Sequence, residues 1–383
     1  IIPPSMIGLI LLLFTPEFIT EFTALLREGR AVMSADQLPI DRSDGFLVVA
    51  GPTASGKSSL CLDIAQQVDG VIINADALQL YRDLDLLSAR PDEAALAAAP
   101  HALYGVLDGA TRCSVGLWLA HAKAAVNDAR AAGKIPILVG GTGMYLNASL
   151  NGISSIPDVP DEVRREITEM HSALGGQRFH AELATIDPRL AERLAPGDTQ
   201  RLIRGMEVYT HTKTPLSWWQ QQPLEGYING TGYTIALTPP RDAVYANIER
   251  RFDMMFDNGA VGEVEHLIAR NLDPGLPVMK ALGVSQIADF LSGAISKDDA
   301  IMQAKRDSRH YAKRQMTWIR NNFISKITAS FAKNLGRKSE IIGSKGKIIV
   351  EDTWTANPSK VILKNKNKEL VFNFASEKSV YSY

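Results

Sequence analysis

The sequence has little cysteine and little excess charge. Its 383 residues include two cysteines, Cys61 and Cys113, which belong to no C-x-x-C or His-rich pattern. A disulfide scaffold and a structural zinc site are therefore disfavoured, and a reducing compartment such as the cytoplasm is expected. The 41 Lys and Arg residues balance 42 Asp and Glu residues, which gives a formal net charge of −1. This balance excludes binding of nucleic acid by bulk positive charge, but it does not exclude a local basic strip.

A hydrophobic run long enough to span a membrane is also missing near the start of the chain. The apolar run at residues 6–14 has nine residues, whereas a transmembrane helix needs about 20. No Lys or Arg precedes this run, so it lacks the charged start of a signal peptide. We expect no membrane association, and we interpret residues 1–32 as a leader of uncertain origin that precedes a candidate start at Met33.

The two ends of the chain differ in their basic residues. Residues 1–326 contain 9 Lys and 22 Arg, whereas residues 327–383 contain 9 Lys and 1 Arg. Within this last segment, residues 341–350 and 360–374 each show two short apolar runs around a turn, the pattern of a β-hairpin. We expect residues 327–383 to be a Lys-rich β tail of foreign origin.

The strongest motif follows a continuous apolar run at residues 45–50, which is typical of a strand buried on both faces of a parallel sheet. The motif reads G-x-x-x-x-G-K-S, and apolar residues then recur at helical spacing. Strand, motif and helix together give the full context of a phosphate-binding P-loop. The predicted diphosphate- or nucleotide-binding residues are Gly51, Pro52, Thr53, Ala54, Ser55, Gly56, Lys57 and Ser58.

This motif binds phosphate through its backbone and two side chains. The glycines allow successive N–H groups to point at phosphate oxygens, and the following helix adds the partial positive charge of its N-terminus. Lys57 contributes a mobile charge. The Ser58 hydroxyl is placed to bind Mg²⁺, which is the cofactor that we expect.

Two further apolar runs end in polar loops. Residues 71–76 end at Asp76, so a carboxylate lies at the carboxyl edge of the sheet, where open α/β sheets bind ligands. Residues 135–139 lead into Gly140-Gly141-Thr142-Gly143, which on its own is equally well an ordinary structural turn. Motor ATPases usually have an acid at the end of this strand, and its absence favours a transferase or kinase. The predicted fold is α/β, a P-loop NTPase-like parallel sheet flanked by helices.

With these motifs the chain resembles the bacterial tRNA dimethylallyltransferases, also called tRNA isopentenyl transferases. The resemblance spans roughly residues 45–322 and rests on segments at residues 51–58, 74–82, 89–91, 100–104, 138–145, 198–209 and 310–318. It implies transfer of a dimethylallyl group from dimethylallyl diphosphate to N6 of adenosine at tRNA position 37. The P-loop then binds the diphosphate leaving group, and the anticodon stem–loop of tRNA is the partner. We expect a monomer.

The resemblance also assigns roles to single residues. It implies that Asp76 is the general base at N6 and that Thr142 lies across the reaction channel, with Lys57 as the third catalytic residue. Ala77 stands where the family usually has serine, which removes one hydroxyl contact, and Lys213 stands where it usually has glycine in a turn. The residues that match tRNA-contacting segments are Asp76, Ala77, Leu78, Gln79, Thr142, Arg164, Gln200, Arg201, Leu202, Ile203 and Arg204.

The chemistry of the implied reaction suits these residues. N6 of adenine is a poor nucleophile because its lone pair is delocalised into the ring. Catalysis must therefore come from positioning, from a base for the departing proton and from stabilisation of the diphosphate charge. Asp76 can be that base, although without the resemblance a cap on the following turn is the simpler interpretation of this residue.

A local basic strip is present near residue 310. Residues 301–326 contain seven basic residues and one acid, and four of the basic residues fall on one helical stripe: Arg306, Arg309, Lys313 and Arg320. Such a run is most often a solvated face, but in a chain of net charge −1 it favours contact with a phosphate backbone.

Residues 157–235 are predicted to be an insertion of three helices that contacts tRNA. Its Trp218-Trp219 pair could belong to the core or stack on bases.

The predicted domains place the leader first and the catalytic core in two parts, residues 33–156 and 236–326, around the insertion. The second part carries the basic helix and is preceded by a strand at residues 233–237.

A P-loop kinase for a small molecule or nucleotide is the first alternative, but it does not explain the basic helix or the insertion. A non-catalytic RNA-binding regulator is the second alternative, and the intact Lys57, Ser58 and Asp76 argue against it.

Overall fold

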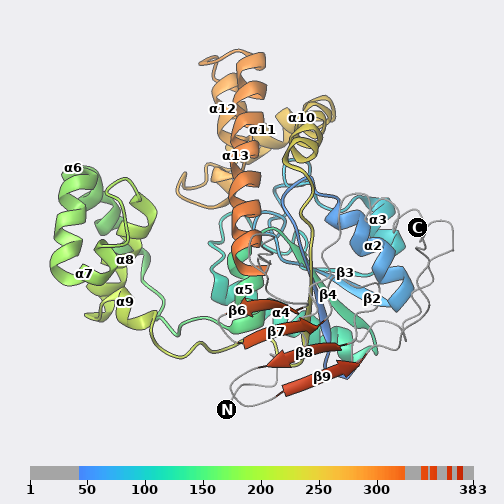
Figure 1. The fold of residues 1–383 in the computed structure, drawn as a ribbon. Helices are drawn as coiled ribbons and strands as arrows, with labels where there is room; N and C mark the ends of the chain where they lie inside the picture. The colour runs from blue at the N-terminus through green and yellow to red at the C-terminus, as the bar shows by residue number, and fades with distance from the viewer. Residues whose placement is uncertain (1–42, 324–337, 344–345, 352–359, 365–368, 374–383) are drawn as a thin grey trace.

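The structure is a computed structural model that describes residues 43–323 and the backbone of four strands between residues 338 and 373. The predicted leader, residues 1–32, lies outside the described residues. Figure 1 shows a parallel sheet with helices on both faces, a group of helices next to the sheet, and a separate helical lobe. The predicted α/β architecture is confirmed.

The sheet has five parallel strands in the order β3-β2-β4-β1-β5. The strands predicted at residues 45–50, 71–76, 135–139 and 233–237 are all present. The strands are β1 (Phe46–Ala50), β2 (Gly70–Asn74), β3 (His101–Ala102), β4 (Ile135–Gly140) and β5 (Gly232–Ala236). The helices of this part of the chain are α2 (Lys57–Val68), α3 (Glu93–Ala98), α4 (Val115–Ala131) and α5 (Gly143–Asn151).

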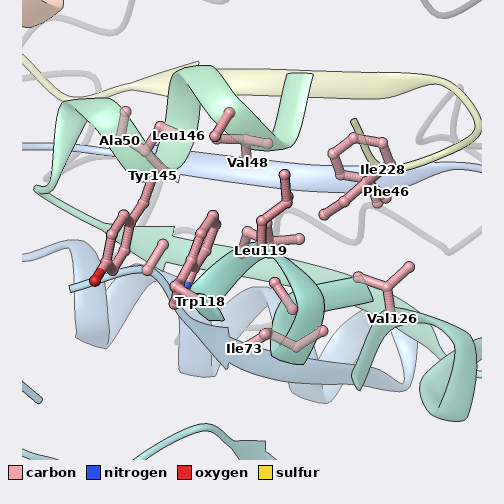
Figure 2. Packing of buried hydrophobic residues seen from close by; sticks show 14 of the residues in the cluster. Phe46, Val48, Ala50, Ile73, Trp118, Leu119, Val126, Tyr145, Leu146 and Ile228 are labelled. Atoms are coloured by element: carbon pink, nitrogen blue, oxygen red, sulfur yellow. The ribbon is translucent and has the colours of Figure 1, made fainter. Parts of the chain in front are cut away.

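Different helices cover the two faces of the sheet. Successive residues of a strand point to opposite faces, so neighbouring residues of β1 belong to different clusters. On one face Val48 packs in a cluster with Trp118 of α4 and Leu146 of α5, as Figure 2 shows. On the other face the neighbouring residue of the strand, Val49, packs in a cluster with Leu60 of α2. β1 is therefore buried on both faces, which explains its uninterrupted apolar sequence.

The second half of the chain adds a helical group with its own core. Phe252, Val264 and Ile287 form part of this core, which also contains Tyr81 and Leu84 from the segment after β2. The last helix of the group contacts α5 and β5, so it links the group to the sheet. The elements are α10 (Arg241–Asp257), α11 (Ala260–Ala269), η2 (Val278–Lys280), α12 (Val284–Leu291) and α13 (Lys297–Phe323).

The helical insertion forms a lobe with a core of its own, which includes Phe179, Leu183 and Leu202. Gly175 has non-helical backbone angles (φ 70°, ψ 161°) and divides α6 into two helical halves. With α8, these halves give the three helices that the sequence predicts. Two short helices of four residues each complete the lobe. The helices of the lobe are α6 (Asp161–Ile186), α7 (Pro188–Ala191), α8 (Thr199–Thr212) and α9 (Leu216–Trp219).

The two ends of the lobe meet where they leave the core. Ile153 and Glu225 form an isolated antiparallel bridge, in which each backbone N–H donates to the other residue's carbonyl oxygen at 2.8 and 2.9 Å. The chain then returns to the sheet as β5, which pairs with β1. β5 begins at Gly232, so the last residues of the range 157–235 lie in the sheet and not in the lobe.

Beyond residue 337 the described backbone forms a second sheet of four antiparallel strands in the order β6-β7-β8-β9. Both predicted hairpins are confirmed, since β6 pairs with β7 and β8 pairs with β9. These strands are β6 (Lys338–Gly343), β7 (Gly346–Glu351), β8 (Lys360–Lys364) and β9 (Glu369–Asn373).

Both cysteines are free thiols, and burial raises the pKa of Cys61. Cys61 lies on α2 in the core that covers one face of the sheet. Among the helices that the structure describes, none has the length and apolar character needed to cross a membrane.

Candidate active site

Three loops meet at the carboxyl edge of the sheet. The P-loop follows β1, the turn of Asp76 follows β2, and the Gly-rich turn of Thr142 follows β4. Because β4 lies between β1 and β2, its turn lies between the other two loops. The backbone N–H of Ala77 donates to Oγ1 of Thr142 at 3.1 Å, which joins the second loop to the third. The structure thus brings the predicted Asp76 and Thr142 together beside the P-loop.

The P-loop has the backbone that its motif requires. Gly56 has a φ of 85°, in the left-handed region that glycine tolerates, and Ala54 has a φ of 60° despite its side chain. The side-chain amide of Asn247 on α10 donates to the carbonyl oxygen of Ala54 at 3.2 Å, which supports this conformation. The buried Ser55 hydroxyl has no hydrogen-bond partner among the described residues. An unsatisfied buried hydroxyl in such a loop is suited to a ligand oxygen.

Two cations lie at the P-loop next to Asp76. The ammonium group of Lys57 donates to the carbonyl oxygen of Pro52 at 3.0 Å. Burial lowers the pKa of Lys57 to about 8; the charge of Asp76 opposes this shift and the charge of Arg251 adds to it. Arg251, on α10, donates to the hydroxyl of Thr53, and burial lowers its pKa while Asp76 raises it. Two partly desolvated cations beside a phosphate loop make a strong anion site.

Asp76 belongs to a rigid turn. The Asn74 side chain accepts from the backbone N–H of Asp76 at 2.8 Å and donates to the carbonyl oxygens of Asp76 and Leu103 at 2.9 and 3.0 Å. Oδ1 of Asp76 accepts from the N–H of Leu78 at 3.1 Å. Asp76 is therefore a turn cap, as one interpretation predicted, and it also faces the site. The two interpretations do not exclude each other.

Two tyrosines complete the surroundings of Asp76. Burial raises the pKa of Tyr104 and of Tyr311, and in both cases the charge of Asp76 adds to the increase. The side chain of Thr142 lies beside the Tyr311 hydroxyl and opposes part of this increase in pKa. Both phenols are therefore protonated at neutral pH. Tyr104 and Tyr311 lie in segments that carried the resemblance, but the sequence assigned no role to either.

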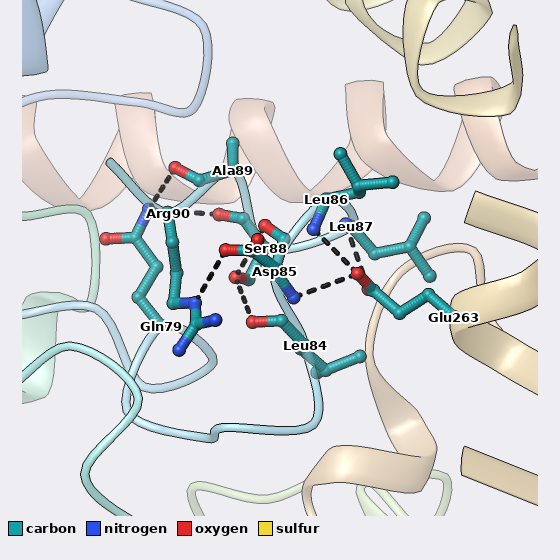
Figure 3. Close-up of polar contacts among 9 residues, drawn as sticks. All are labelled: Gln79, Leu84, Asp85, Leu86, Leu87, Ser88, Ala89, Arg90 and Glu263. Carbon is teal, nitrogen blue, oxygen red and sulfur yellow. Dashed lines mark hydrogen bonds and ion pairs between the residues drawn. The ribbon is translucent and has the colours of Figure 1, made fainter. Parts of the chain in front are cut away.

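The loop after Asp76 is fixed by two side chains, as Figure 3 shows. Nε2 of Gln79 donates to the carbonyl oxygens of Ser88 and Ala89 at 2.9 and 2.8 Å. The carboxylate of Glu263 on α11 accepts three successive backbone N–H groups, those of Asp85, Leu86 and Leu87, at 2.9, 2.7 and 3.1 Å. The predicted RNA contact of Gln79 is therefore limited to its Oε1 atom, while its Nε2 shapes the loop.

We expect Glu263→Ala to lower the free energy of unfolding by roughly 2–3 kcal/mol, because three N–H groups lose their shared charged acceptor. The thermal midpoint measures this loss, and amide hydrogen exchange should become faster at Asp85, Leu86 and Leu87. Glu265→Ala is the matched control, since it removes the same charge from an exposed position of the same helix. Equal melting temperatures for the two variants would contradict this role.

The predicted tRNA-contacting residues of the insertion lie on α6 and α8. Arg164 and Arg204 both lie 3.5 Å from carboxylate oxygens of Glu207, which is 5% exposed. Gln200 and Arg201 are exposed, and Ile203 is partly buried. Leu202 is fully buried in the core of the lobe, so its side chain is not on the surface.

Two other features of the lobe bear on the predictions. Lys213 ends α8 in the left-handed region (φ 56°), and its N–H donates to the carbonyl oxygen of Tyr209 at 2.8 Å. The turn is thus formed without glycine, at a cost of about 1 kcal/mol. Of the tryptophan pair, Trp218 is 48% exposed and Trp219 packs against the lobe core.

The basic stripe on α13 is shorter than the sequence predicts. Of the four predicted members, Arg306 lies 3.2 Å from Asp307 on the same helix, and Arg309 pairs with Glu249 on α10. Lys305, which is not on the stripe, lies 2.6 Å from Asp253 of α10. Arg309 and Lys305 are therefore neutralised within the helical group. The exposed cations nearer the end of the helix are Lys313, Arg314 and Arg320.

Fold and site together define an α/β protein with a P-loop, in which a carboxylate and two cations face one anion-binding loop. The family model described as IPP transferase matches residues 79–322, and the one described as isopentenyl transferase matches residues 45–103. The chain belongs to the tRNA dimethylallyltransferase family.

Individual relatives agree with these family models. The chain is 50% identical over 286 residues to a tRNA dimethylallyltransferase of Rhodospirillum rubrum, which covers 74% of this chain and 88% of the relative. It is 46% identical over 278 residues to a tRNA dimethylallyltransferase of Hyphomonas neptunium, and this match covers 72% of this chain and 88% of the relative. A crystal structure of a eukaryotic dimethylallyltransferase acting on tRNA is similar with a TM-score of 0.59 and 26% identity, covering 72% of this chain and 69% of that one.

Proposed function

We propose that this chain transfers a dimethylallyl group from dimethylallyl diphosphate to N6 of adenosine 37 in tRNA and releases diphosphate. The observation that carries the proposal is the meeting of the P-loop with Asp76 at the turn of Thr142, next to the cations Lys57 and Arg251. A kinase site would need the same loop, but the family to which the chain belongs favours the transferase.

The residues of the site have complementary roles in this reaction. N6 attacks the first carbon of the dimethylallyl group, and the bond from that carbon to the diphosphate oxygen breaks with its electron pair on the oxygen. Lys57, Arg251 and the P-loop N–H groups stabilise the charge that develops on the diphosphate. Asp76 accepts the proton that N6 loses. Thr142 orients the turn of Asp76 through its bond with Ala77.

The residues at the start of α2 fit a magnesium ion that arrives with the diphosphate. Ser58 is exposed there, and no group of three or more His, Cys, Asp or Glu residues in the described part of the chain could hold a metal alone. Mg²⁺ is usually bound by few protein oxygens together with substrate phosphates. When bound, the ion would neutralise diphosphate charge, and Ser58 would supply its protein ligand.

The tRNA is proposed to bind through cations on the insertion lobe and on α13. Arg164 and Arg204 lie on the insertion lobe, and exposed cations continue on α13 as Lys313, Arg314 and Arg320. Cations in such positions contact the phosphate backbone without reading the sequence. Together with Gln79 and α8 they would hold the anticodon stem–loop. We further propose that the protein acts in the cytoplasm as a monomer.

We expect kcat/KM for dimethylallyl diphosphate to fall as the pH rises above about 8. Lys57 has a pKa of about 8, so it is charged below this pH and becomes neutral above it. The charged form attracts diphosphate, and the loss should therefore approach about tenfold per pH unit on the alkaline side. Initial rates at saturating tRNA measure this profile. Lys57→Arg keeps its charge throughout this range, so a similar alkaline fall in that variant would contradict the assignment.

One assay tests the proposed function directly. The protein is incubated with tRNA, Mg²⁺ and dimethylallyl diphosphate, the tRNA is digested to nucleosides, and the mass of dimethylallyl-adenosine is sought. We expect this mass in the presence of the donor, and its absence would overturn the proposal. Consumption of ATP with a small acceptor would instead identify a kinase, and no reaction of either kind would favour a regulator.

A further inference from the structure

The side chain of Gln315 on α13 joins two of the three loops of the site. Its Oε1 accepts the backbone N–H of Thr53 at 2.8 Å, and its Nε2 donates to the carbonyl oxygen of Gly141 at 2.9 Å. Thr53 belongs to the P-loop, and Gly141 directly precedes Thr142. A single amide group therefore connects the loop for the diphosphate to the turn that carries Thr142.

The surroundings of Gln315 leave it little freedom. The residue is 5% exposed, and a Cβ atom at Gly141 would lie 2.1 Å from its Nε2, so glycine is required there for the amide to approach. The hydroxyl of Tyr311, one turn earlier on α13, lies beside the side chains of Thr142 and Gln315. The two hydrogen bonds of Gln315 therefore hold its amide in a buried place, where satisfied polar groups are rigid.

We propose that Gln315 is a positioning residue for the transfer reaction, which fixes the separation between the P-loop and the turn of Thr142. The inference rests on the proposed function, because that reaction places the donor's diphosphate on one side of this gap and the accepting N6 on the other. Both bonds of Gln315 go to backbone atoms of the protein, so it acts through Thr53 and Gly141. Misplacement of reacting groups by about 1 Å can lower a rate by about 10²-fold.

The test compares Gln315→Met, which keeps the length of the side chain and removes both hydrogen bonds, with the wild-type protein. We expect the single-turnover rate at saturating donor and tRNA to fall about 10- to 100-fold, while the dissociation constant of tRNA changes less than about twofold. Ile319→Val is the control for a general packing defect, since Ile319 is 1% exposed on the same helix. It should transfer at the wild-type rate.

A double-mutant cycle with Thr142→Ala separates positioning from a merely structural role. If Gln315 acts through the turn of Thr142, Gln315→Met should slow the Thr142→Ala protein far less than it slows the wild-type protein. A loss of stability alone would leave the two effects independent, so multiplying effects on the rate would overturn the proposal.

A second variant keeps the test decisive if Met at this position prevents folding. Gln315→Glu keeps an acceptor for Thr53 and loses the donor for Gly141, and we expect slower transfer here too. Wild-type rates in the variants that fold, checked by circular dichroism, would overturn the role of Gln315. If the wild-type protein itself makes no dimethylallyl-adenosine, the proposed function fails; if it transfers normally and the variants do too, only this inference fails.

Discussion

Asp76→Asn is expected to lower the single-turnover rate of transfer by about 10²- to 10⁴-fold, the usual contribution of a positioned proton acceptor. The change keeps the size of the side chain and removes its basicity. Asparagine can still accept from the N–H of Leu78, so the turn should persist and the melting temperature should change little. Binding of tRNA and of dimethylallyl diphosphate should also change little, because the loss lies in the transition state.

The control for this variant is Asp92→Asn. The Asp92 side chain caps α3 by accepting from the N–H of Ala95 at 2.8 Å, outside the candidate site. The same substitution there tests capping alone, and transfer should stay at the wild-type rate. If Asp76→Asn lowers the melting temperature strongly but transfers at a near-normal rate, Asp76 is a structural cap and not the base.

Lys57→Ala is expected to nearly abolish transfer, with a loss of about 10²-fold or more, because it removes a cation that faces the developing diphosphate charge. The fold should survive the change, since Lys57 has a depressed pKa and burial of its charge opposes folding. Single-turnover rates measure the loss of transfer, and calorimetry with inorganic diphosphate and Mg²⁺ measures the loss of diphosphate affinity. Both should be large.

Lys123→Ala provides the matched control for the removal of a lysine. Lys123 lies on α4, away from the P-loop, and is partly exposed. We expect wild-type turnover and diphosphate binding in this variant. Wild-type turnover in Lys57→Ala, by contrast, would remove the basis for assigning the P-loop to the diphosphate.

The parts of the site that the sequence predicts are those set by local order along the chain. The P-loop follows its strand directly, and Asp76 and Thr142 follow theirs within a few residues, so parallel pairing alone brings them to one edge. Arg251 could not be found in this way. It meets Thr53 across 198 residues, as an ordinary arginine on an amphipathic helix, and its sequence carries no signal of that contact.

The basic stripe shows a second limit of sequence reasoning. Helical spacing correctly places Arg309 and Lys313 on one helix, but exposure depends on the element that packs against it. Glu249 on α10 neutralises Arg309, whereas Lys313 is exposed. The acid on α10 is 60 residues away in the sequence, so only the tertiary structure separates the cations that face solvent from those that are paired.

The bridge between Ile153 and Glu225 has a consequence for how this protein can change. The lobe has its own core, and a pair of hydrogen bonds joins the two segments that connect it to the sheet. For the sheet, the lobe is therefore a closed loop between two fixed ends. Closing a longer or shorter loop differs by only about 0.6 kcal/mol per doubling of length. Lobes of different size or sequence can therefore be exchanged at residues 153 and 225 with little cost to the sheet. The tRNA contact proposed for the lobe can therefore be altered without a change to the P-loop site.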